Sequence, residues 1–302
     1  MLWGAGYIYL ERRALLEYEL LKGNIECVAF CVRDKVAGQI EGVPVIDPEE
    51  IKEYEFDYIL VFSDLYFEEI KREIVHELGY KENVVLSSKI LLIYGFDFKR
   101  YIDVYRNPVT IVCKDCLAAV IYHNLHLPFS SPFSLTAMTD GEFFKLLSNF
   151  DHYFNSELFL VNDADINRGI YATAALGDII DNVKIMMYHY RDFREAKEAW
   201  VRRKKRVNTN RFLFIASISN EIELGVFKSC KIPGRKLGFV TDPDFEDGEI
   251  FYYLPRYRYY AMNSADKYGQ TLSNYLRNND FLSHGVDVLK MLSGDPDFVR
   301  EI

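Results

Sequence analysis

The sequence predicts an α/β protein of two domains, each a mainly parallel sheet flanked by helices, with a Rossmann-like first domain. Strand and helix patterns alternate along the first ninety or so residues, which is the order that builds a doubly wound parallel sheet. The periodicity is interrupted over Tyr94–Asn107, and a second alternation of strands and helices then begins. We therefore expect domains over residues 1–95 and 107–302.

In the first domain, apolar runs predict four strands, at Met1–Trp3, Glu26–Cys31, Asp57–Phe62 and Asn83–Ser87. Leucines at helical spacing predict a helix over Tyr7–Lys22, and Gly23 suits its C-terminal cap. Pro48 favours the first turn of a short helix at Pro48–Tyr54. Asp64 is placed to cap the helix that follows the third strand.

In the second domain, the same criteria predict strands at Val109–Val112, Lys184–Tyr188, Phe212–Ile215 and Leu237–Val240. The expected helices are Leu117–Leu125, Gly141–Phe154, Tyr190–Asn208, Gln270–Phe281 and His284–Leu292. An irregular loop over Pro128–Phe133 lies between the first two of them.

Bulk composition narrows the class of protein. A chain of 302 residues that is 49% hydrophobic has ample material for a core, and its formal charge of −9 argues against nonspecific nucleic-acid binding. No stretch approaches the roughly 18 apolar residues of a membrane span, and the N-terminus lacks the pattern of a signal peptide. Five sparse cysteines suit reduced thiols. We expect a cytoplasmic protein with neither nucleic-acid partner nor transmembrane segment.

One arginine lies on the apolar face of a predicted helix. Within residues 190–208, Phe193, Ala196, Trp200 and Val207 share one stripe, and Arg203 falls in the middle of it. A face of this kind packs inward, so Arg203 needs either a buried anionic partner or a bound anion. The alternative is that its stem covers the apolar face while its charge reaches solvent.

A glycine pair follows the first strand. Gly4-x-Gly6 precedes a helix, where backbone amides can approach a phosphate, and Asp34 after the second strand is placed to accept bonds from ribose hydroxyls. Tyr9 occupies the position of the third glycine in that fingerprint, so a tight turn without a ligand is an equal interpretation. The possible cofactor is a nucleotide sugar bound to the first domain.

The wider pattern of the first domain resembles a known module. Trp3-Gly-Ala-Gly6, Val28–Asp34, Gly38–Val45 and Asp57–Val61 are similar to the N-terminal domain of sialic-acid and bacillosamine-type sugar O- and N-acyltransferases. That resemblance implies a nucleotide-sugar-binding module. The chain has none of the hexapeptide repeats of those enzymes, so the resemblance ends near residue 95 and does not imply their acyltransfer chemistry.

The second domain contains a series of motifs over roughly residues 107–242. They are Cys113-Lys-Asp-Cys-Leu-Ala-Ala119, Ile121-Tyr122, Leu127-Pro-Phe-Ser-Ser-Pro132, Leu176-Gly-Asp178, His189-Tyr190 and Trp200-x-x-Arg203-x-x-Arg206-Val-Asn208. In order and spacing these motifs resemble a bacterial domain-of-unknown-function family loosely described as exopolysaccharide biosynthesis proteins. The first motif departs from the family pattern Ser-Asn-Asn-Cys-Trp-Gly-Gly, because Lys114 and Asp115 replace asparagines, Leu117 replaces tryptophan, and two alanines replace glycines.

These motifs supply the candidate site residues. We expect Asp178, His189 or Cys116 to be catalytic, and a sugar nucleotide or sugar phosphate to be bound by a set comprising Arg203, Arg206, Asn208, Asp115, Ser131 and Trp200. Asp178 is either a base, a partner of Arg203 or a turn cap, and Trp200 is more often a core residue than a sugar platform. His189 is expected at the carboxyl end of a parallel strand, where such sheets bind ligands, or as a core histidine.

Cys113-x-x-Cys116 has several interpretations. It suits a redox pair, half of a zinc site, small core residues, or a nucleophilic Cys116 with His123, His126 or His189 as base. A zinc site needs two further ligands that the sequence does not offer at a suitable spacing, so no metal is expected.

Three functions remain after these observations. The first is a transferase acting on a nucleotide-linked or phosphate-linked sugar in surface-polysaccharide assembly, in which arginines hold phosphate and Asp178 or His189 is the base. The second is a non-catalytic sugar-nucleotide binding or assembly protein, favoured by the replaced motif positions. The third is a cysteine-dependent hydrolase or acyl-transfer enzyme.

Overall fold

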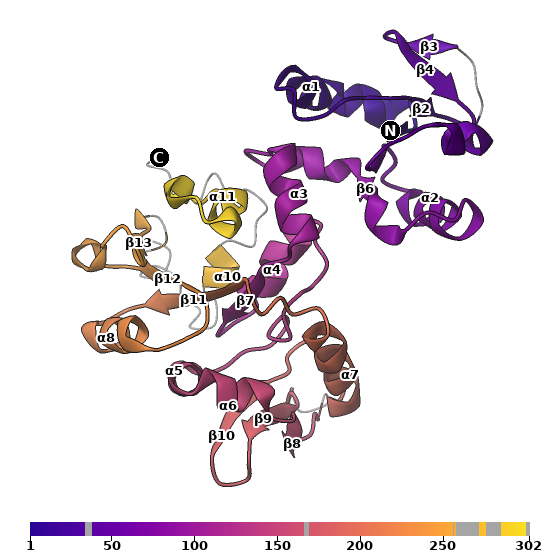
Figure 1. The fold of residues 1–302 in the computed structure, drawn as a ribbon. Helices are drawn as coiled ribbons and strands as arrows, with labels where there is room; N and C mark the ends of the chain where they lie inside the picture. Colours follow the sequence, from indigo (N-terminus) through magenta and orange to yellow (C-terminus); the bar gives the residue numbers. More distant parts are fainter. Residues whose placement is uncertain (34–37, 166–168, 256, 258–271, 276–284, 300–302) are drawn as a thin grey trace. The chain divides into compact units, whose positions relative to one another are not determined.

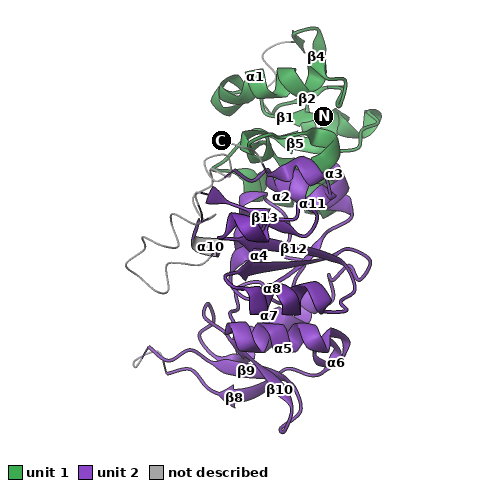
Figure 2. Cartoon of the chain, turned by 90° about the vertical axis from the view of Figure 1, so that its left-hand side faces the viewer, with its two compact units in different colours: residues 1–101 green, residues 102–302 purple. Residues whose placement is uncertain are grey.

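The chain folds into two compact units, Met1–Tyr101 and Ile102–Ile302, which Figure 2 distinguishes by colour. The computed structural model describes residues 1–33, 38–165, 169–255, 257, 272–275 and 285–299. The division falls inside helix α3 (Phe98–Arg106), so the stretch where the sequence loses its periodicity contains a helix. Its apolar Tyr101 and Val104 are buried, whereas most of its other side chains are polar.

Unit 1 is built on a six-stranded sheet (Figure 1), whose order is β3-β4-β2-β1-β5-β6. Its strands are β1 (Leu2–Trp3), β2 (Phe30–Cys31), β3 (Gln39–Ile40), β4 (Val43–Ile46), β5 (Ile59–Val61) and β6 (Val85–Ser87). All neighbours pair in parallel except β3 and β4. Because the order reverses direction at β1, this is a doubly wound sheet, as the sequence predicted.

One prediction about the helices of unit 1 is wrong. They are α1 (Tyr7–Leu21) and α2 (Phe67–Arg72), with shorter turns η1 (Pro48–Glu53), η2 (Glu73–Glu77), η3 (Glu82–Val84) and η4 (Ser88–Leu92). Asp64 was expected to cap α2, but that helix begins after Tyr66. The Asp64 carboxylate instead holds the Arg12 guanidinium in two hydrogen bonds of 2.8 and 2.6 Å.

Unit 2 contains a parallel sheet of order β13-β12-β11-β7 (Figure 1). Its strands are β7 (Thr110–Cys113), β11 (Phe212–Ile218), β12 (Arg235–Val240) and β13 (Phe251–Tyr253). The helices around it include α4 (Leu117–Asn124), α7 (Phe193–Lys204), α8 (Glu221–Ser229), α10 (Leu272–Tyr275) and α11 (Val288–Ser293). The α/β class with helix-flanked parallel sheets is therefore confirmed for both units. The predicted helix Gln270–Phe281 lies mostly outside the described residues.

A second, antiparallel sheet was not expected in unit 2. It has the order β10-β9-β8, formed by β8 (Phe159–Asn162), β9 (Thr173–Gly177) and β10 (Asn182–Met186), with α5 (Asp140–Ser148) and α6 (Phe150–Asn155) beside it (Figure 2). The prediction that the strand before His189 is parallel is thus wrong. The single helix predicted over Gly141–Phe154 is interrupted at Asn149, whose φ of −146° leaves the helical region.

One apolar core joins the two sheets of unit 2. Phe150 packs edge-on against Phe212 and Phe214 of β11, at ring-centroid distances of 5.3 and 4.8 Å. The same cluster includes Leu176, Val183 and Ile185 from the antiparallel sheet. Both sheets are therefore fixed relative to each other inside unit 2, which allows residues from each to form a single site.

Of the two glycines in the Gly4-x-Gly6 pair, Gly4 should be the one that the fold requires. Its φ is +95°, and a Cβ there would lie 3.3 Å from the Phe62 carbonyl oxygen. Gly6 has an extended backbone at the start of α1, and a Cβ there would meet nothing within 4 Å. We predict that Gly4→Ser lowers the free energy of unfolding by about 1–3 kcal/mol. The matched Gly6→Ser should be neutral or stabilising, because serine is a good N-cap. Equal losses in urea unfolding would contradict this assignment.

Candidate functional site

Cys116 and His189 lie in contact at the carboxyl end of β7. Cys116 is the residue immediately before α4, and its Sγ lies 3.3 Å from His189 Nε2. Cys116 is partly buried and His189 is exposed, so the pair is accessible from solvent. Of the three histidines considered as a base, the structure places His189 beside the sulfur. A thiol within hydrogen-bond reach of an imidazole is the arrangement that generates a nucleophilic thiolate.

The loop after α4 brings these two residues together. Its Met138 N–H donates to the Lys114 carbonyl at 2.7 Å, just beyond β7. The neighbouring Ala137 exchanges two backbone hydrogen bonds with Met186, the last residue of β10, at 2.9 and 2.8 Å. Thr136 of the same loop presents its carbonyl oxygen 3.8 Å from Cys116 Sγ. The loop thus links the end of the parallel strand before Cys116 to the end of the antiparallel strand before His189.

Ser131 anchors this loop and is not available to a ligand. Its side chain is fully buried, its hydroxyl donates to the Ile111 carbonyl at 2.5 Å, and its Oγ accepts from Phe133 N at 3.2 Å. The expectation that Ser131 binds substrate is therefore wrong, because both of its hydrogen-bonding directions are used within the fold.

Arg203 is buried, as its place on the helix predicted. It is 6% exposed, and its Nη1 donates to the Ser134 carbonyl at 2.7 Å and to the Tyr190 hydroxyl. The guanidinium carbon also lies over the rings of Phe129 and Tyr190, 5.1 and 5.8 Å from their centroids. Because so little of Arg203 is exposed, its charge does not extend freely into solvent. Both hydrogen-bond partners are uncharged, so the alternative in which Asp178 pairs with Arg203 is wrong.

Tyr190 connects Arg203 to the Cys116–His189 pair. It follows His189 in the chain and receives the Arg203 hydrogen bond. Burial raises the pKa of the Tyr190 phenol, and the nearby positive charge of Arg203 opposes part of that increase. The phenol is therefore neutral at physiological pH and is held in place by a cation.

Two unusual features occur in the loop between these groups. Leu135 has a φ of +63°, in the left-handed region that side chains with a Cβ rarely occupy. The adjacent Ser134 hydroxyl is fully buried and has no hydrogen-bond partner among the described residues. Sequence reasoning missed both residues, because neither the backbone conformation nor the unsatisfied hydroxyl follows from a residue pattern. Phe129 and Tyr190 were part of recognised motifs, but their contact with Arg203 depends on the tertiary fold.

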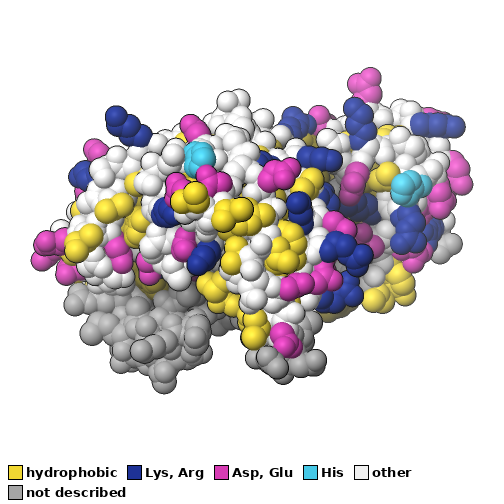
Figure 3. All heavy atoms as spheres, turned by 90° about the horizontal axis from the view of Figure 1, so that it is seen from below, with side chains coloured by type: hydrophobic (Ala, Val, Ile, Leu, Met, Phe, Trp, Pro, Cys, Tyr) yellow, Lys and Arg dark blue, Asp and Glu magenta, His cyan; other side chains and the backbone are white. Residues whose placement is uncertain are grey.

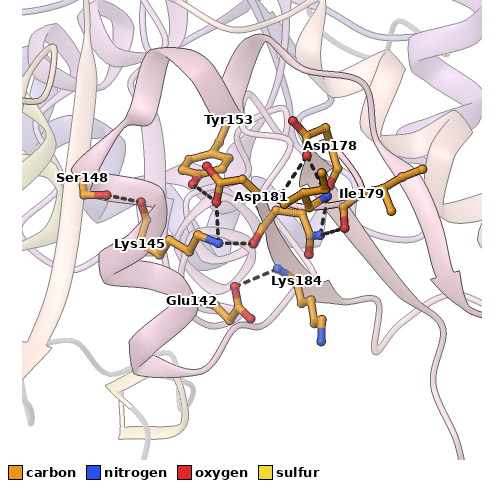
Figure 4. A network of polar contacts seen from close by, with 10 residues as sticks. Glu142, Lys145, Ser148, Tyr153, Asp178, Ile179, Asp181 and Lys184 are labelled. Carbon is orange, nitrogen blue, oxygen red and sulfur yellow. Dashed lines mark hydrogen bonds and ion pairs between the residues drawn. The ribbon is translucent and has the colours of Figure 1, made fainter.

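Asp178 lies elsewhere, in the turn between β9 and β10 (Figure 4). Its Oδ1 accepts from Ile180 N at 2.7 Å and Asp181 N at 2.8 Å, and these bonds lower the pKa of its carboxyl. Gly177 before it has a φ of +108°, and a Cβ there would lie 2.3 Å from the Asp181 carbonyl oxygen. The Leu-Gly-Asp motif therefore encodes a tight turn, and the prediction that Asp178 acts as a base in the same site as Arg203 is wrong.

The same turn is held by an ion pair. Asp181 accepts from Lys145 of α5 at 2.8 Å and from the Tyr153 hydroxyl of α6 at 2.9 Å (Figure 4). These contacts lower the pKa of Asp181 and fix the turn to the two helices. They leave the Ile179 and Ile180 side chains more than nine-tenths exposed.

Three other predicted ligand residues are not brought to the pair. Trp200 is 3% exposed and packs edge-on against Phe133, so it is a core residue. Arg206 is exposed beyond the end of α7. Asn208 bonds to Thr110 at the amino end of β7, opposite to the end that leads to Cys116.

In the Cys113–Ala119 motif, the side chains of Asp115 and Cys113 make local contacts. Asp115 accepts from Leu117 N at 2.9 Å, and Cys113 Sγ accepts from Ala118 N at 3.4 Å, so both side chains cap the start of α4. Burial raises the pKa of the Cys113 thiol well above its ordinary value. Cys113 therefore stays a protonated structural thiol, and one oxygen of the Asp115 carboxylate is used at the start of α4. The described part of the chain holds no group of three or more His, Cys, Asp or Glu arranged around a metal.

Unit 1 presents a separate candidate site at the carboxyl ends of its central strands. Gly4 and Gly6 form the loop from β1 to α1, and Asp34 lies outside the described residues. Arg12 of α1 is buried between Asp64 and Ser88, which follow β5 and β6, and donates to the Ser88 hydroxyl at 2.7 Å. Its Nε is enclosed without a partner in the part of the chain described. This network occupies the switch point of the sheet, where ligands of such folds bind.

Comparison with known families places the chain in one of them. The model of the family described as "Domain of unknown function (DUF1919)" matches residues 73–282, so the chain belongs to that family. A second family model, described as "C2185-like, N-terminal", matches residues 1–86. A Haemophilus influenzae relative described as "Uncharacterized protein" is 26% identical over 147 residues, which cover 48% of this chain and 68% of the relative. The resemblance noted for the second domain is thereby confirmed at the level of the family.

The surface is of mixed character. In Figure 3, positive and negative side chains are interspersed on the face shown, with hydrophobic side chains exposed between them. None of the helices within the described ranges is long and apolar enough to cross a membrane.

If Asp178 only stabilises the turn, its loss should lower the stability of the protein without changing the reactivity of Cys116. We predict that Asp178→Ala lowers the thermal unfolding temperature at neutral pH, because two backbone N–H groups lose their acceptor. Alkylation of Cys116 by iodoacetamide, followed by mass spectrometry, should keep its wild-type rate.

Asp178→Asn is the matched control, since it retains an acceptor oxygen but no charge. The folded-state pKa of Asp178 is lowered. The wild type should therefore be more stable than Asp178→Asn above the unfolded pKa of about 3.9, and this advantage should disappear as pH falls through the folded pKa. A slower Cys116 alkylation in either variant would contradict a purely structural role and indicate that Asp178 contributes to the site of Cys116.

Proposed function

We propose that unit 2 is a cysteine-dependent acyl-transfer or hydrolytic enzyme, with Cys116 as nucleophile and His189 as general base. The observation that carries this proposal is the 3.3 Å contact between Cys116 Sγ and His189 Nε2 at the start of α4. Side-chain nucleophiles of this kind need a base within hydrogen-bond reach, and the positive end of a helix further favours a thiolate.

The covalent step follows from this geometry. His189 Nε2 takes the thiol proton, the sulfur attacks the acyl carbon, and the bond to the leaving group breaks as His189 returns the proton to that group. A hydroxyl of water or of a sugar acceptor then attacks the thioester while His189 takes its proton. The carbon–sulfur bond breaks, and the Cys116 sulfur is released and reprotonated.

The pathway that we propose for this chemistry is surface-polysaccharide assembly. The support is the resemblance of the family motifs, of which Cys116, His189 and Arg203 meet in one place in the fold. A sugar hydroxyl is then the natural acyl acceptor. A nucleotide sugar bound beside Gly4 and Gly6 of unit 1 is the corresponding proposal for the N-terminal module. There α1 begins next to the exposed Gly6 and has no acidic side chain in its first turn.

The second candidate function is a non-catalytic sugar-nucleotide binding protein. One observation favours it: the N–H of Leu117, the residue after the candidate nucleophile, already donates to the Asp115 carboxylate. In many acyl-transfer enzymes such an amide stabilises the oxyanion, and here it is occupied. An inert Cys116 would support this alternative.

Chemical modification distinguishes the two functions. We predict that Cys116 reacts with iodoacetamide at pH 7 faster than an ordinary thiol, by up to about 30-fold, because an unperturbed thiol is only a few per cent ionised at that pH. His189→Ala should remove this advantage. The measurement is the rate of alkylation of the peptide containing Cys116.

His123→Ala is the matched control, because His123 is an exposed histidine of α4 that was considered as a base. It should react like the wild type. Equal rates in wild type, His189→Ala and an unfolded peptide of the same sequence would overturn the catalytic proposal.

A further inference from the structure

The geometry points to an anionic substrate: we infer that Arg203 binds a carboxylate or phosphate group of the molecule that Cys116 attacks. This inference rests on the proposed nucleophilic role of Cys116, and it names the class of substrate for that same site. It follows from the charge balance around Arg203, from the donors that remain free on its guanidinium, and from its connection to the Cys116–His189 pair.

The charge of Arg203 is buried without a counter-ion. Arg203 is only 6% exposed, and its hydrogen bonds to described residues are those of Nη1 to a backbone carbonyl and a phenol. No carboxylate of the described residues forms an ion pair with it. By contrast, the buried Arg12 of unit 1 is neutralised by Asp64. A buried, unpaired cation is costly, and a bound anion removes that cost.

The free donors have the geometry of an oxyanion site. An arginine carries five N–H groups, and Nη1 uses its two on Ser134 and Tyr190. The N–H groups of Nε and Nη2 remain, and this edge of the guanidinium is the fork that binds carboxylates and phosphates through two parallel bonds. Unlike Arg12 Nε, these two nitrogens are not completely enclosed. They are therefore the donors that we expect to bind the anion.

Two short connections keep Arg203 near the reactive pair. Its Nη1 bonds to the Ser134 carbonyl, while Cys116 Sγ contacts the Thr136 carbonyl two residues later. Two residues span at most about 7 Å. Nη1 also bonds to Tyr190, whose chain neighbour is His189. The unpaired Ser134 hydroxyl lies in the same loop and offers one further donor. The sulfur and the guanidinium thus contact the same loop within two residues of each other, so one substrate can contact both.

A purely structural role of Arg203 leads to a different expected result. If it only clamps Ser134 and Tyr190, its loss affects the reaction of Cys116 with neutral and anionic reagents equally. If it binds an oxyanion, its loss affects the anionic reagent more. Iodoacetate and iodoacetamide have the same leaving group and nearly the same size, but only iodoacetate carries a carboxylate. The ratio of their rates at Cys116 therefore reports the anion site separately from the reactivity of the sulfur.

We expect the iodoacetate-to-iodoacetamide ratio to fall by about tenfold or more in Arg203→Met, as for the loss of a hydrogen bond to a charged group. Arg202→Met is the control, because it removes the same charge from an exposed position on the same helix. His189→Ala should slow both reagents together and leave the ratio high. An unchanged ratio in Arg203→Met, or an equal fall in Arg202→Met, overturns the inference. Rates independent of His189 overturn the proposed function instead.

A second measurement uses the unmodified protein, in case Arg203→Met does not fold. Inorganic phosphate or acetate should protect Cys116 from iodoacetamide at least fivefold better than chloride at equal ionic strength. Stronger protection by phosphate would indicate a phosphorylated substrate, and stronger protection by acetate a carboxylate. Equal rates in phosphate, acetate and chloride would contradict an oxyanion site.

Discussion

The candidate site depends on the backbone hydrogen bonds of the loop that follows α4. Met138 bonds to Lys114 beyond the parallel sheet, and Ala137 pairs with Met186 at the end of the antiparallel sheet. Each backbone bond contributes only about 1 kcal/mol. Together they place residues that are 73 positions apart, Cys116 and His189, within one hydrogen-bond distance. Two side chains also hold this loop: the buried Ser131 hydroxyl bonds to the Ile111 carbonyl, and Arg203 bonds to the Ser134 carbonyl.

Much of the fold was predictable because its signals are local. Apolar runs located β1, β5, β7, β11 and β12, and the alternation of strands and helices indicated doubly wound sheets. The antiparallel β8–β9–β10 sheet escaped prediction because the pairing of strands is a tertiary property, and β10 resembles a parallel strand in sequence. Asp64 was assigned to a helix cap because local sequence cannot show that a buried arginine 52 residues earlier needs its charge.

The candidate site was predictable only in part. The helical wheel placed Arg203 on the apolar face of its helix, and the family motifs contained Cys116 and His189. Which motif residues meet was not encoded in their spacing: Asp178 shapes a hairpin turn, Asn208 bonds to the other end of β7, and Trp200 fills the core. Sequence motifs therefore mix residues that stabilise the fold with residues that surround the sulfur, and only tertiary contacts separate them.

The central claim is that Cys116 and His189 act as one unit. A double-mutant cycle on the hydrolysis of p-nitrophenyl acetate tests it most directly, with Cys116→Ala, His189→Ala and the double variant compared by their rates of p-nitrophenol release. We expect strong non-additivity: the double variant should be no slower than Cys116→Ala alone, because histidine has no nucleophile to activate once the thiol is gone. Losses that add across the two single variants would contradict it, since they would mean that the two side chains act independently.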